Sequence, residues 1–239
     1  MRLLALMGTL LLLLACAAGG ETTAAASDLT LRYANPEAAE DTMVIERDSA
    51  GRIRVSEGER QALIIREGTT YILFTPPGPG GRIVARMEDY LAVGAEMRAN
   101  MIRAGALTGD VDNTAYRLND QGDATVGQWR GRSYELSPQG SGVSLSAIMS
   151  GDPALADARA LATRAIGELE RASRAVLIYP EQFTRMSAEL LGRGMPIAWN
   201  GLQLQYMTTE AVPASRFELP SPALSREALR ARALSGATP

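Results

Sequence analysis

The sequence predicts an α+β protein in which helices pack against an antiparallel β-sheet. Two observations carry this prediction. Between residues 28 and 86, apolar and polar residues alternate in short runs with turn residues between them, which is the pattern of half-buried antiparallel strands. Further along the chain, apolar residues recur at three- and four-residue spacings in several segments, as they do on amphipathic helices.

Six runs in the first region have the strand pattern. Ile53 and Val55, for example, alternate with polar neighbours, and the turn DSAG precedes them. We expect these strands to form a meander with one dry and one wet face. The runs are LTLRYA, MVIER, RIRVSEG, RQALIIREG, TTYILFTP and GRIVARM.

The period changes to that of a helix in MEDYLAVGAEMRANMIRAGAL. Tyr90, Val93, Met97 and Met101 then fall on one side, and Asp89 is a candidate cap for the start. We expect this side to lie on the sheet. It is either ordinary core or a cover over an apolar cavity, where flexible methionine side chains adapt to a ligand.

The second half of the body predicts more strands and two helices. TAYRLN and ATVGQWRGRSYEL read as strands joined by a turn at NDQGD, and VSLSAIMS follows as another strand. Asp152 and Pro153 are a suitable cap and first residue for an alanine-rich helix; PEQFTRMSAELLGRG predicts a shorter one. Asn200-Gly201 is the signal of a two-residue hairpin. The apolar stripe of the alanine-rich helix is Leu155, Ala158, Leu161, Ala162, Ala165, Ile166, Leu169 and Ala172.

The N-terminal segment has the layout of an export signal. It carries one positive charge, a leucine-rich run and then small residues, and the run is shorter than the roughly 20 apolar residues that span a bilayer. The stretch LLAC, ending at Cys16, resembles the bacterial lipobox, after which the cysteine becomes the acylated first residue. We therefore expect residues 1–15 to be a signal peptide and 16–27 to be a lipidated cysteine and flexible tether. Simple cleavage, with Cys16 as leader filler, is the alternative.

The composition limits the chemistry. The 239 residues include no histidine, all 24 basic residues are arginine, and Cys16 is the single cysteine. Zinc sites built on histidine, Ser-His-Asp triads and lysine Schiff bases are therefore excluded, and only carboxylates or carboxylate-bound metals are left for a hydrolase. A net charge of −3 gives no reason to expect nucleic acid binding.

Several blocks together resemble a known group of proteins. They are ATVGQWRGRSYEL, GDPAL before a helix, GMPIAW with its hairpin, and VPASRFELP. This succession resembles uncharacterised bacterial periplasmic families of unknown function, which are similar in layout to the lipoprotein-carrier (LolA/LolB-like) half-barrels. The resemblance covers most of residues 28–220, which we expect to form one domain, with 221–239 as a C-terminal helix or tail.

The resemblance implies an incomplete antiparallel barrel with helices packed in or over its open face. In characterised carriers the enclosed cavity takes acyl chains. A protein anchored at its N-terminus is not a free shuttle, so the lipobox favours a receptor or resident binding protein. By strand alternation or helix spacing, the candidates for a cavity wall, with ordinary core as the alternative for each, are Ile53, Val55, Ile65, Ile72, Phe74, Met97, Met101, Trp199 and Leu204.

Other candidate sites have weaker patterns. The acidic stretch from Asp110 to Asp123 offers oxygen ligands for calcium, but it lacks the glycine and glutamate of an EF-hand, and solvated turns explain it equally well. PPGPGG lacks the lysine of a phosphate-binding loop. The pair Glu168 and Glu170 has the carboxylates of acid/base catalysis and also the pattern of a wet helix face. The same helix carries arginines that suit either a wet face or anionic lipid heads.

We expect an exported envelope lipoprotein in the bacterial periplasm, anchored to the outer membrane through Cys16. It would bind an apolar or acyl ligand without catalysis and without a cofactor or metal. Its expected partners are a lipid, the membrane and an envelope protein, and not nucleic acid. Three alternatives stay open: a soluble periplasmic form, a scaffold module with a filled core, and a hydrolase that would need two converging carboxylates in a concave site.

Overall fold

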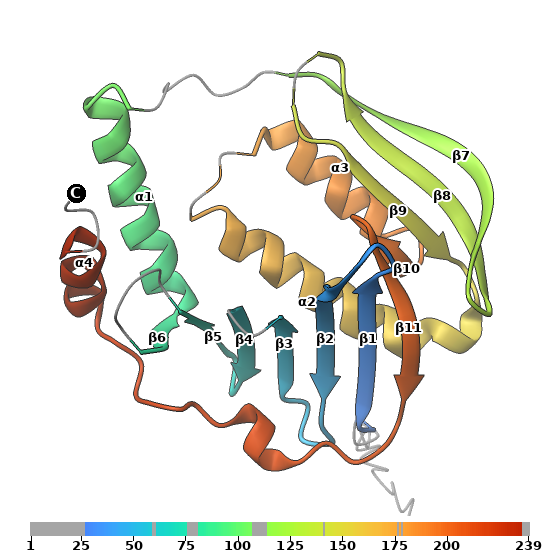
Figure 1. Ribbon diagram of the computed structural model, residues 1–239, viewed down its shortest axis with the longest axis horizontal. Coiled ribbons are helices and arrows are strands. Elements are labelled where there is room, and N and C mark those ends of the chain that lie inside the picture. Colours follow the sequence, from blue (N-terminus) through green and yellow to red (C-terminus); the bar gives the residue numbers. More distant parts are fainter. Residues whose placement is uncertain are drawn as a thin grey trace, which may run out of the picture.

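The protein is an α+β structure built on one large antiparallel sheet (Figure 1). The computed structural model describes residues 27–58, 61–75, 81–106, 114–140, 142–175, 177 and 179–235. These residues include α1 (Met87–Arg103), α2 (Ala156–Ser173), α3 (Glu181–Leu191), α4 (Arg226–Ser235) and the 3-10 helices η1 (Pro153–Leu155) and η2 (Ala214–Phe217). The predicted fold class is confirmed at this level.

The sheet has eleven strands within the described residues and is open, because the two strands at its ends do not pair. Its spatial order is β6-β5-β4-β3-β2-β1-β11-β10-β9-β8-β7. The strands are β1 (Leu29–Asn35), β2 (Ala38–Arg47), β3 (Ile53–Glu57), β4 (Gln61–Arg66), β5 (Thr69–Phe74), β6 (Ile83–Arg86), β7 (Tyr116–Val126), β8 (Trp129–Pro138), β9 (Leu145–Ser150), β10 (Met195–Trp199) and β11 (Leu202–Thr208).

Two meanders are joined by the last hairpin. Strands β1–β6 form the first meander and β7–β9 the second. The β10–β11 hairpin lies between them, with β10 against β9 and β11 against β1. Asn200 and Gly201 both have positive φ, at 48° and 85°, which is the geometry of the two-residue turn that their types predict. Figure 1 shows the sheet bending around α2 and α3.

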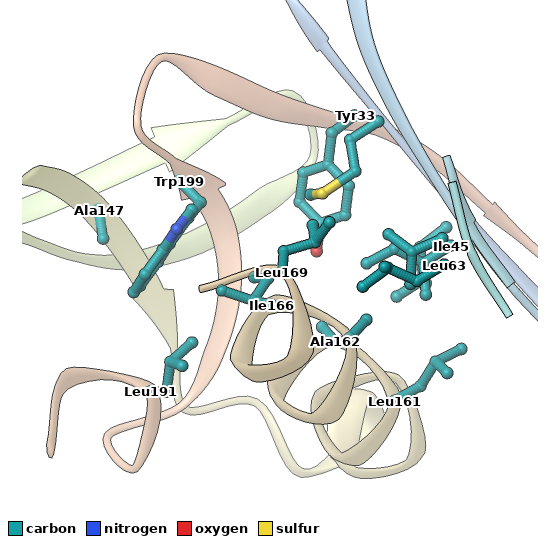
Figure 2. Packing of buried hydrophobic residues seen from close by; sticks show 14 of the residues in the cluster. Tyr33, Ile45, Leu63, Ala147, Leu161, Ala162, Ile166, Leu169, Leu191 and Trp199 are labelled. Carbon is teal, nitrogen blue, oxygen red and sulfur yellow. The ribbon is translucent and has the colours of Figure 1, made fainter. Parts of the chain in front are cut away.

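Helix α2 supplies the centre of the core. Its predicted apolar stripe is confirmed: the helix buries Ala158, Leu161, Ala162, Ala165, Ile166, Leu169 and Ala172. In Figure 2, side chains from both halves of the sheet converge on α2, with Tyr33, Ile45 and Leu63 on one side and Trp199 on the other. The small alanine side chains allow close approach of helix and sheet, and α2 packs on β1, β2, β3 and β10 at the middle of the sheet.

Asp152 and Pro153 begin the helical segment as predicted, although its first turn is the 3-10 helix η1. The Asp152 carboxylate accepts a hydrogen bond from the Ala154 amide at 2.9 Å. This bond satisfies one of the amides that the first turn of a helix leaves free.

A buried tyrosine ties the two halves of the sheet together. Tyr33 on β1 is fully buried, and its hydroxyl donates to the Pro196 carbonyl on β10 at 2.8 Å. The pairing of β9 and β10 shifts register between Pro196 and Ala198. The Pro196 carbonyl lies at this irregularity of the β9–β10 pairing. The Tyr33 hydroxyl supplies it with a hydrogen-bond donor.

We expect Tyr33→Phe to lower the free energy of unfolding by about 1–2 kcal/mol, because the Pro196 carbonyl would stay buried without this partner. Urea unfolding followed by circular dichroism would measure the change. Tyr206→Phe is the control, since Tyr206 is 44% exposed and its loss should change little. Equal stability of the Tyr33 variant and the wild type would contradict this role.

The outer face of the first meander is covered at β4, β5 and β6, contrary to the sequence expectation, whereas β1 keeps the expected alternation with Arg32 exposed. Four consecutive residues of β4, Ala62 to Ile65, are buried. Leu63 and Ile65 face the α2 side, whereas Ala62 and Ile64 belong to a second cluster. That cluster is completed by Val212 and Phe217. A strand covered on both faces loses the polar alternation of a half-covered one.

The segment 209–225, which we call the strap, provides this cover. It leaves β11, passes below β2 and β3 and reaches β6 (Figure 1). Phe217 in η2 is fully buried and receives the Arg52 guanidinium over its ring at 5.1 Å. At the far end, the Leu224 amide donates to the Val84 carbonyl at 2.9 Å. The strap therefore covers both the outer face and part of the β6 edge.

A buried carboxylate fixes the middle of the strap. Glu46 on β2 is 7% exposed, and its oxygens accept hydrogen bonds from Arg216 at 2.8–3.2 Å. Arg54 lies 3.7 Å from the same carboxylate, and its pKa is lowered by burial and by the charge of Arg216. Arg54 and Arg216 thus share one buried carboxylate. Because a buried carboxylate is costly without its partners, this contact holds the strap in one position.

Helix α1 is held in place by contacts of its N-terminal half with the sheet and with α4. Phe74 and Tyr90 pack with ring centroids 5.5 Å apart. Asp89 is not the cap, because the helix already begins at Met87; the Asp89 carboxylate accepts from Arg226 of α4 at 2.9 Å. The C-terminal half of α1 leaves the sheet in Figure 1, which explains why Met101 is 42% exposed.

The NDQGD stretch is a bulged part of β7, where the sequence predicts a turn. The register slips between Asp120 and Gly122, Gly122 has φ +91°, and the Asp120 carboxylate accepts from the Gly122 amide at 2.9 Å. Turn-forming residues here absorb an extra residue within the strand. The turn comes later, at Gly127 and Gln128.

Candidate functional site: a cavity between the helices and the sheet

The inner side of the sheet is not completely filled. A cavity of about 180 Å³ lies where α2 and the start of α3 meet strands from both meanders. Apolar side chains form most of its wall and polar groups gather along part of it. The lining residues are Met43, Glu57, Val143, Ser144, Leu145, Ile166, Leu169, Glu170, Ser173, Tyr179, Phe183, Trp199, Asn200 and Leu202.

Helix α2 contributes one continuous face to the cavity. Leu169 and Glu170 follow Ile166 by three and four residues, and Ser173 follows them by four and three, which places all four on one side of a helix. Two of these residues are apolar and two are polar, with the polar ones toward the C-terminus. The wall that α2 contributes therefore changes from apolar to polar toward the C-terminal end of the helix.

Aromatic rings form another part of the cavity wall. Tyr179 and Phe183 stack with centroids 5.2 Å apart, and Phe183 meets Tyr116 of β7 edge-on at 5.4 Å. The Tyr116 amide donates to the Gln182 side chain at 3.1 Å, and Gln182 donates back to the Tyr116 carbonyl at 3.2 Å. Helix α3 is thereby fixed to β7, so the two lining rings have defined positions.

Glu170 is a half-buried carboxyl on the polar side. The Ser187 hydroxyl of α3 donates a hydrogen bond to Glu170 Oε1. Burial raises the pKa of Glu170, and this effect outweighs the opposing influence of Ser187 and Arg174. Desolvation disfavours the charged form of a carboxyl. A partner that neutralises the charge of Glu170 would therefore stabilise its ionised form.

Glu57 and Tyr179 share this polar side. Glu57, the last residue of β3, has an exposed side chain, although nearby protein removes part of its hydration and raises its pKa. Burial raises the pKa of the Tyr179 hydroxyl, and the negative charges of Glu170 and Glu57 raise it further. Tyr179 therefore stays a neutral donor beside two carboxyl groups.

Glu170→Gln should remove part of the pH dependence of stability. A carboxyl whose pKa is raised on folding binds more protons in the folded state, so its stabilising contribution is present at low pH and is lost as pH rises through the raised pKa. We expect the glutamine variant to gain stability relative to wild type between about pH 4 and about pH 7, by about 1.4 kcal/mol per unit by which the pKa is raised. Urea unfolding of both proteins at the two pH values would measure this. A constant difference would contradict the assignment.

The predicted wall residues have four different positions. Trp199 lines the cavity. Five others are buried in the main core cluster: Ile53, Val55, Ile65, Ile72 and Leu204. Phe74 and Met97 lie partly buried at the edge of the same cluster, and Met101 is exposed. The cavity lies beside α2 and α3, whereas the sequence offered a place beneath α1 as the alternative to ordinary core.

Some sequence hypotheses fall outside the described residues. Cys16 and the tether up to residue 26 are among them, as are PPGPG at 76–80 and the first part of the acidic stretch, 110–113. Within the described ranges, no group of three or more His, Cys, Asp or Glu is placed to hold a metal ion. Asp120 instead accepts from Arg132 at 2.7 Å. No helix in the described part is both long and apolar enough to cross a bilayer.

A second, wider recess lies on the outside of the protein. It has a volume of about 610 Å³ and lies between the end of the strap, the start of α4 and the β5–β6 edge. Its charged lining residues include Asp89 and Arg226, which already pair with each other at 2.9 Å. The inner cavity is the better candidate, because its carboxyl groups lack an arginine within ion-pair distance among the described contacts.

Comparison with models of protein families, with curated proteins and with solved structures gave no match.

Proposed function

We propose that this chain is an exported envelope lipoprotein whose curved sheet is a half-barrel of the lipoprotein-carrier type, and that it binds an apolar ligand in the inner cavity. The observation that carries the proposal is the cavity between α2, α3 and the sheet, walled by Ile166, Leu169 and Trp199. Apolar walls with a few polar groups are typical of sites for small ligands. Binding would be by burial of apolar surface, without covalent chemistry.

The size of the cavity limits its occupant. At about 180 Å³ it is smaller than the roughly 300–1,000 Å³ of sites for drug-sized ligands. One aliphatic chain end suits this volume, whereas a ligand with several chains would have to displace side chains of α2 or α3. We therefore expect a single-chain ligand, or one chain of a larger lipid.

Co-purification tests the proposal. Full-length protein extracted from membranes in mild detergent should carry a bound lipid that native mass spectrometry detects. Ser173→Leu adds apolar volume at the cavity wall and should reduce the bound fraction. Ala160→Leu is the matched control, because it adds an aliphatic side chain at an exposed position of the same helix.

The two variants separate specific from adventitious lipid. Equal lipid content in wild type, Ser173→Leu and Ala160→Leu would place the lipid elsewhere and would reject the cavity as its site. Absence of lipid from the wild type, together with no binding of added single-chain amphiphiles, would reject the function itself.

The anchor at Cys16 is a separate part of the proposal and has its own test. Cells that express the full chain would be labelled with a radioactive fatty acid. Wild type should be labelled, and Cys16→Ser should not. Equal labelling of the two proteins, or none in either, would reject the anchor and favour a soluble periplasmic protein.

A carboxylate-dependent hydrolase is the second candidate, because Glu57 and Glu170 line one cavity. Such an enzyme needs one carboxyl protonated and one ionised at the working pH. A panel of chromogenic esters and glycosides would test it. Turnover that disappears in both Glu57→Gln and Glu170→Gln would favour the enzyme over the binding protein.

A further inference from the structure

We infer that the cavity selects a single-chain amphiphile whose polar end is a cationic amine. This inference rests on the proposed binding function and deepens it by naming the chemical class of the ligand. The aliphatic chain would lie against Ile166, Leu169 and Trp199, and the ammonium group would lie between Glu57 and Glu170.

The charges along the cavity wall all have one sign. Of the described residues that line the cavity, Glu57 and Glu170 are the charged ones, and both are acidic. Arg174 lies near enough to act on Glu170 through its charge, but it is not part of the lining. Ser187 donates to one oxygen of Glu170, which leaves the other oxygen to accept from a ligand.

The cavity and the carboxyl groups are independent features that point to the same ligand. The apolar wall provides for the chain, since Ile166 and Leu169 are buried there. Both carboxyl groups at the wall are acceptors when they are ionised, and the half-buried one, Glu170, is costly without a partner. An ammonium donates charge-assisted hydrogen bonds and cancels charge in one contact.

The common alternatives fit this polar side less well. A fatty acid would bring a third carboxylate beside two others, and like charges at one site oppose ionisation. An alcohol would donate one hydrogen bond but would leave the negative charges uncancelled. Tyr179, a neutral donor at the same side, can bind either head group and does not reverse the preference.

Amine binding should strengthen as the carboxyl groups ionise. The groups that face this side are Glu57, Glu170, Tyr179, Ser187 and, by its charge, Arg174. Because the pKa values of both carboxyl groups are raised, the change in affinity belongs in the range just above the ordinary glutamate value. Tyr179, whose pKa is raised above that of an ordinary tyrosine, stays neutral in that range, so the carboxyl groups dominate the pH profile.

Three probes of equal chain length test the inference: decylamine, decanoic acid and 1-decanol. Their binding to the full-length, delipidated protein would be measured by isothermal titration calorimetry below the micelle concentration. We expect decylamine to bind about tenfold or more tightly than the acid and the alcohol, a factor that corresponds to about 1.4 kcal/mol. Glu57→Gln and Glu170→Gln should each reduce decylamine affinity and leave decanol affinity unchanged.

Glu168→Gln is the matched control, because it removes one negative charge from the same helix outside the cavity and next to Arg171, to which Glu168 is paired at 3.3 Å. It should bind decylamine like the wild type. An equal loss in this control would mean general attraction to an acidic protein and would overturn the inference. Equal or tighter binding of the acid or the alcohol would overturn it as well, while the proposed function would stand. Failure of all three probes, with no co-purified lipid, would overturn both.

Discussion

Phe217→Ala is expected to lower the free energy of unfolding by about 3–4 kcal/mol, one of the largest effects of any single truncation in this protein. The ring is fully buried on the outer face of the sheet, where it completes the cluster of Ile64, Leu73 and Val84. Its removal leaves a cavity on that face and also removes the contact of the Arg52 guanidinium with the ring. Urea unfolding would measure the loss.

Phe217→Leu is the matched control for this prediction. Leucine keeps most of the apolar volume, so the cost should fall to about 1–1.5 kcal/mol. If alanine costs no more than leucine, the strap does not contribute its core contacts in solution. Hydrogen exchange would add spatial detail: the amides of β4 and β5 should lose protection first in the alanine variant.

Gly194→Ala is expected to cost about 2–3 kcal/mol, although the substitution is small. Gly194 is buried just before β10, where the chain runs against the end of β9. A Cβ at this position would lie 2.4 Å from the Ser150 carbonyl oxygen and 2.9 Å from its carbon. Both atoms belong to the backbone, so neither can rotate away, and the two strands would have to separate.

Gly151→Ala tests whether this cost is steric. Gly151 is exposed, and a Cβ there would meet no atom within 4 Å. Its replacement should be neutral or stabilising by up to about 1 kcal/mol, through the smaller entropy of the unfolded chain. Thermal unfolding of both variants would provide the comparison. Similar melting temperatures for the two would contradict the close approach at Gly194.

The parts of the fold that the sequence predicts depend on short-range signals. The stripe of α2 repeats within each turn of helix, and the Asn200-Gly201 turn is specified by those two residues. The covered face of β4 depends on Val212 and Phe217, about 150 residues further along the chain. The unbroken apolar run Ala62 to Ile65 lacks the alternation of a half-buried strand, but it does not indicate which segment covers the outer face, so the expectation of a wet face was wrong for β4.

The candidate site was harder to predict than the core. Trp199 was identified because it alternates on a strand, but Glu57 ends a strand and Glu170 lies on a charged helix, where solvated carboxylates are usual. Only the meeting of β3, α2 and the α2–α3 connection brings both to one cavity. One signal was available: Glu170 falls one residue after Leu169 and three before Ser173, on the face that extends the apolar stripe.

The pairing of β1 with β11 has a consequence for how the chain folds. The Tyr33 hydroxyl and the Pro196 carbonyl are 163 positions apart, and the first strand of the sheet shares one ladder with the last. Contacts of such long sequence separation are slow to form, because the chain loses loop-closure entropy before these contacts contribute any stabilisation. The first meander can assemble from neighbouring hairpins, but the junction of the two halves must wait for the final hairpin. The rate-limiting event in folding is therefore expected to be the docking of β11 on β1.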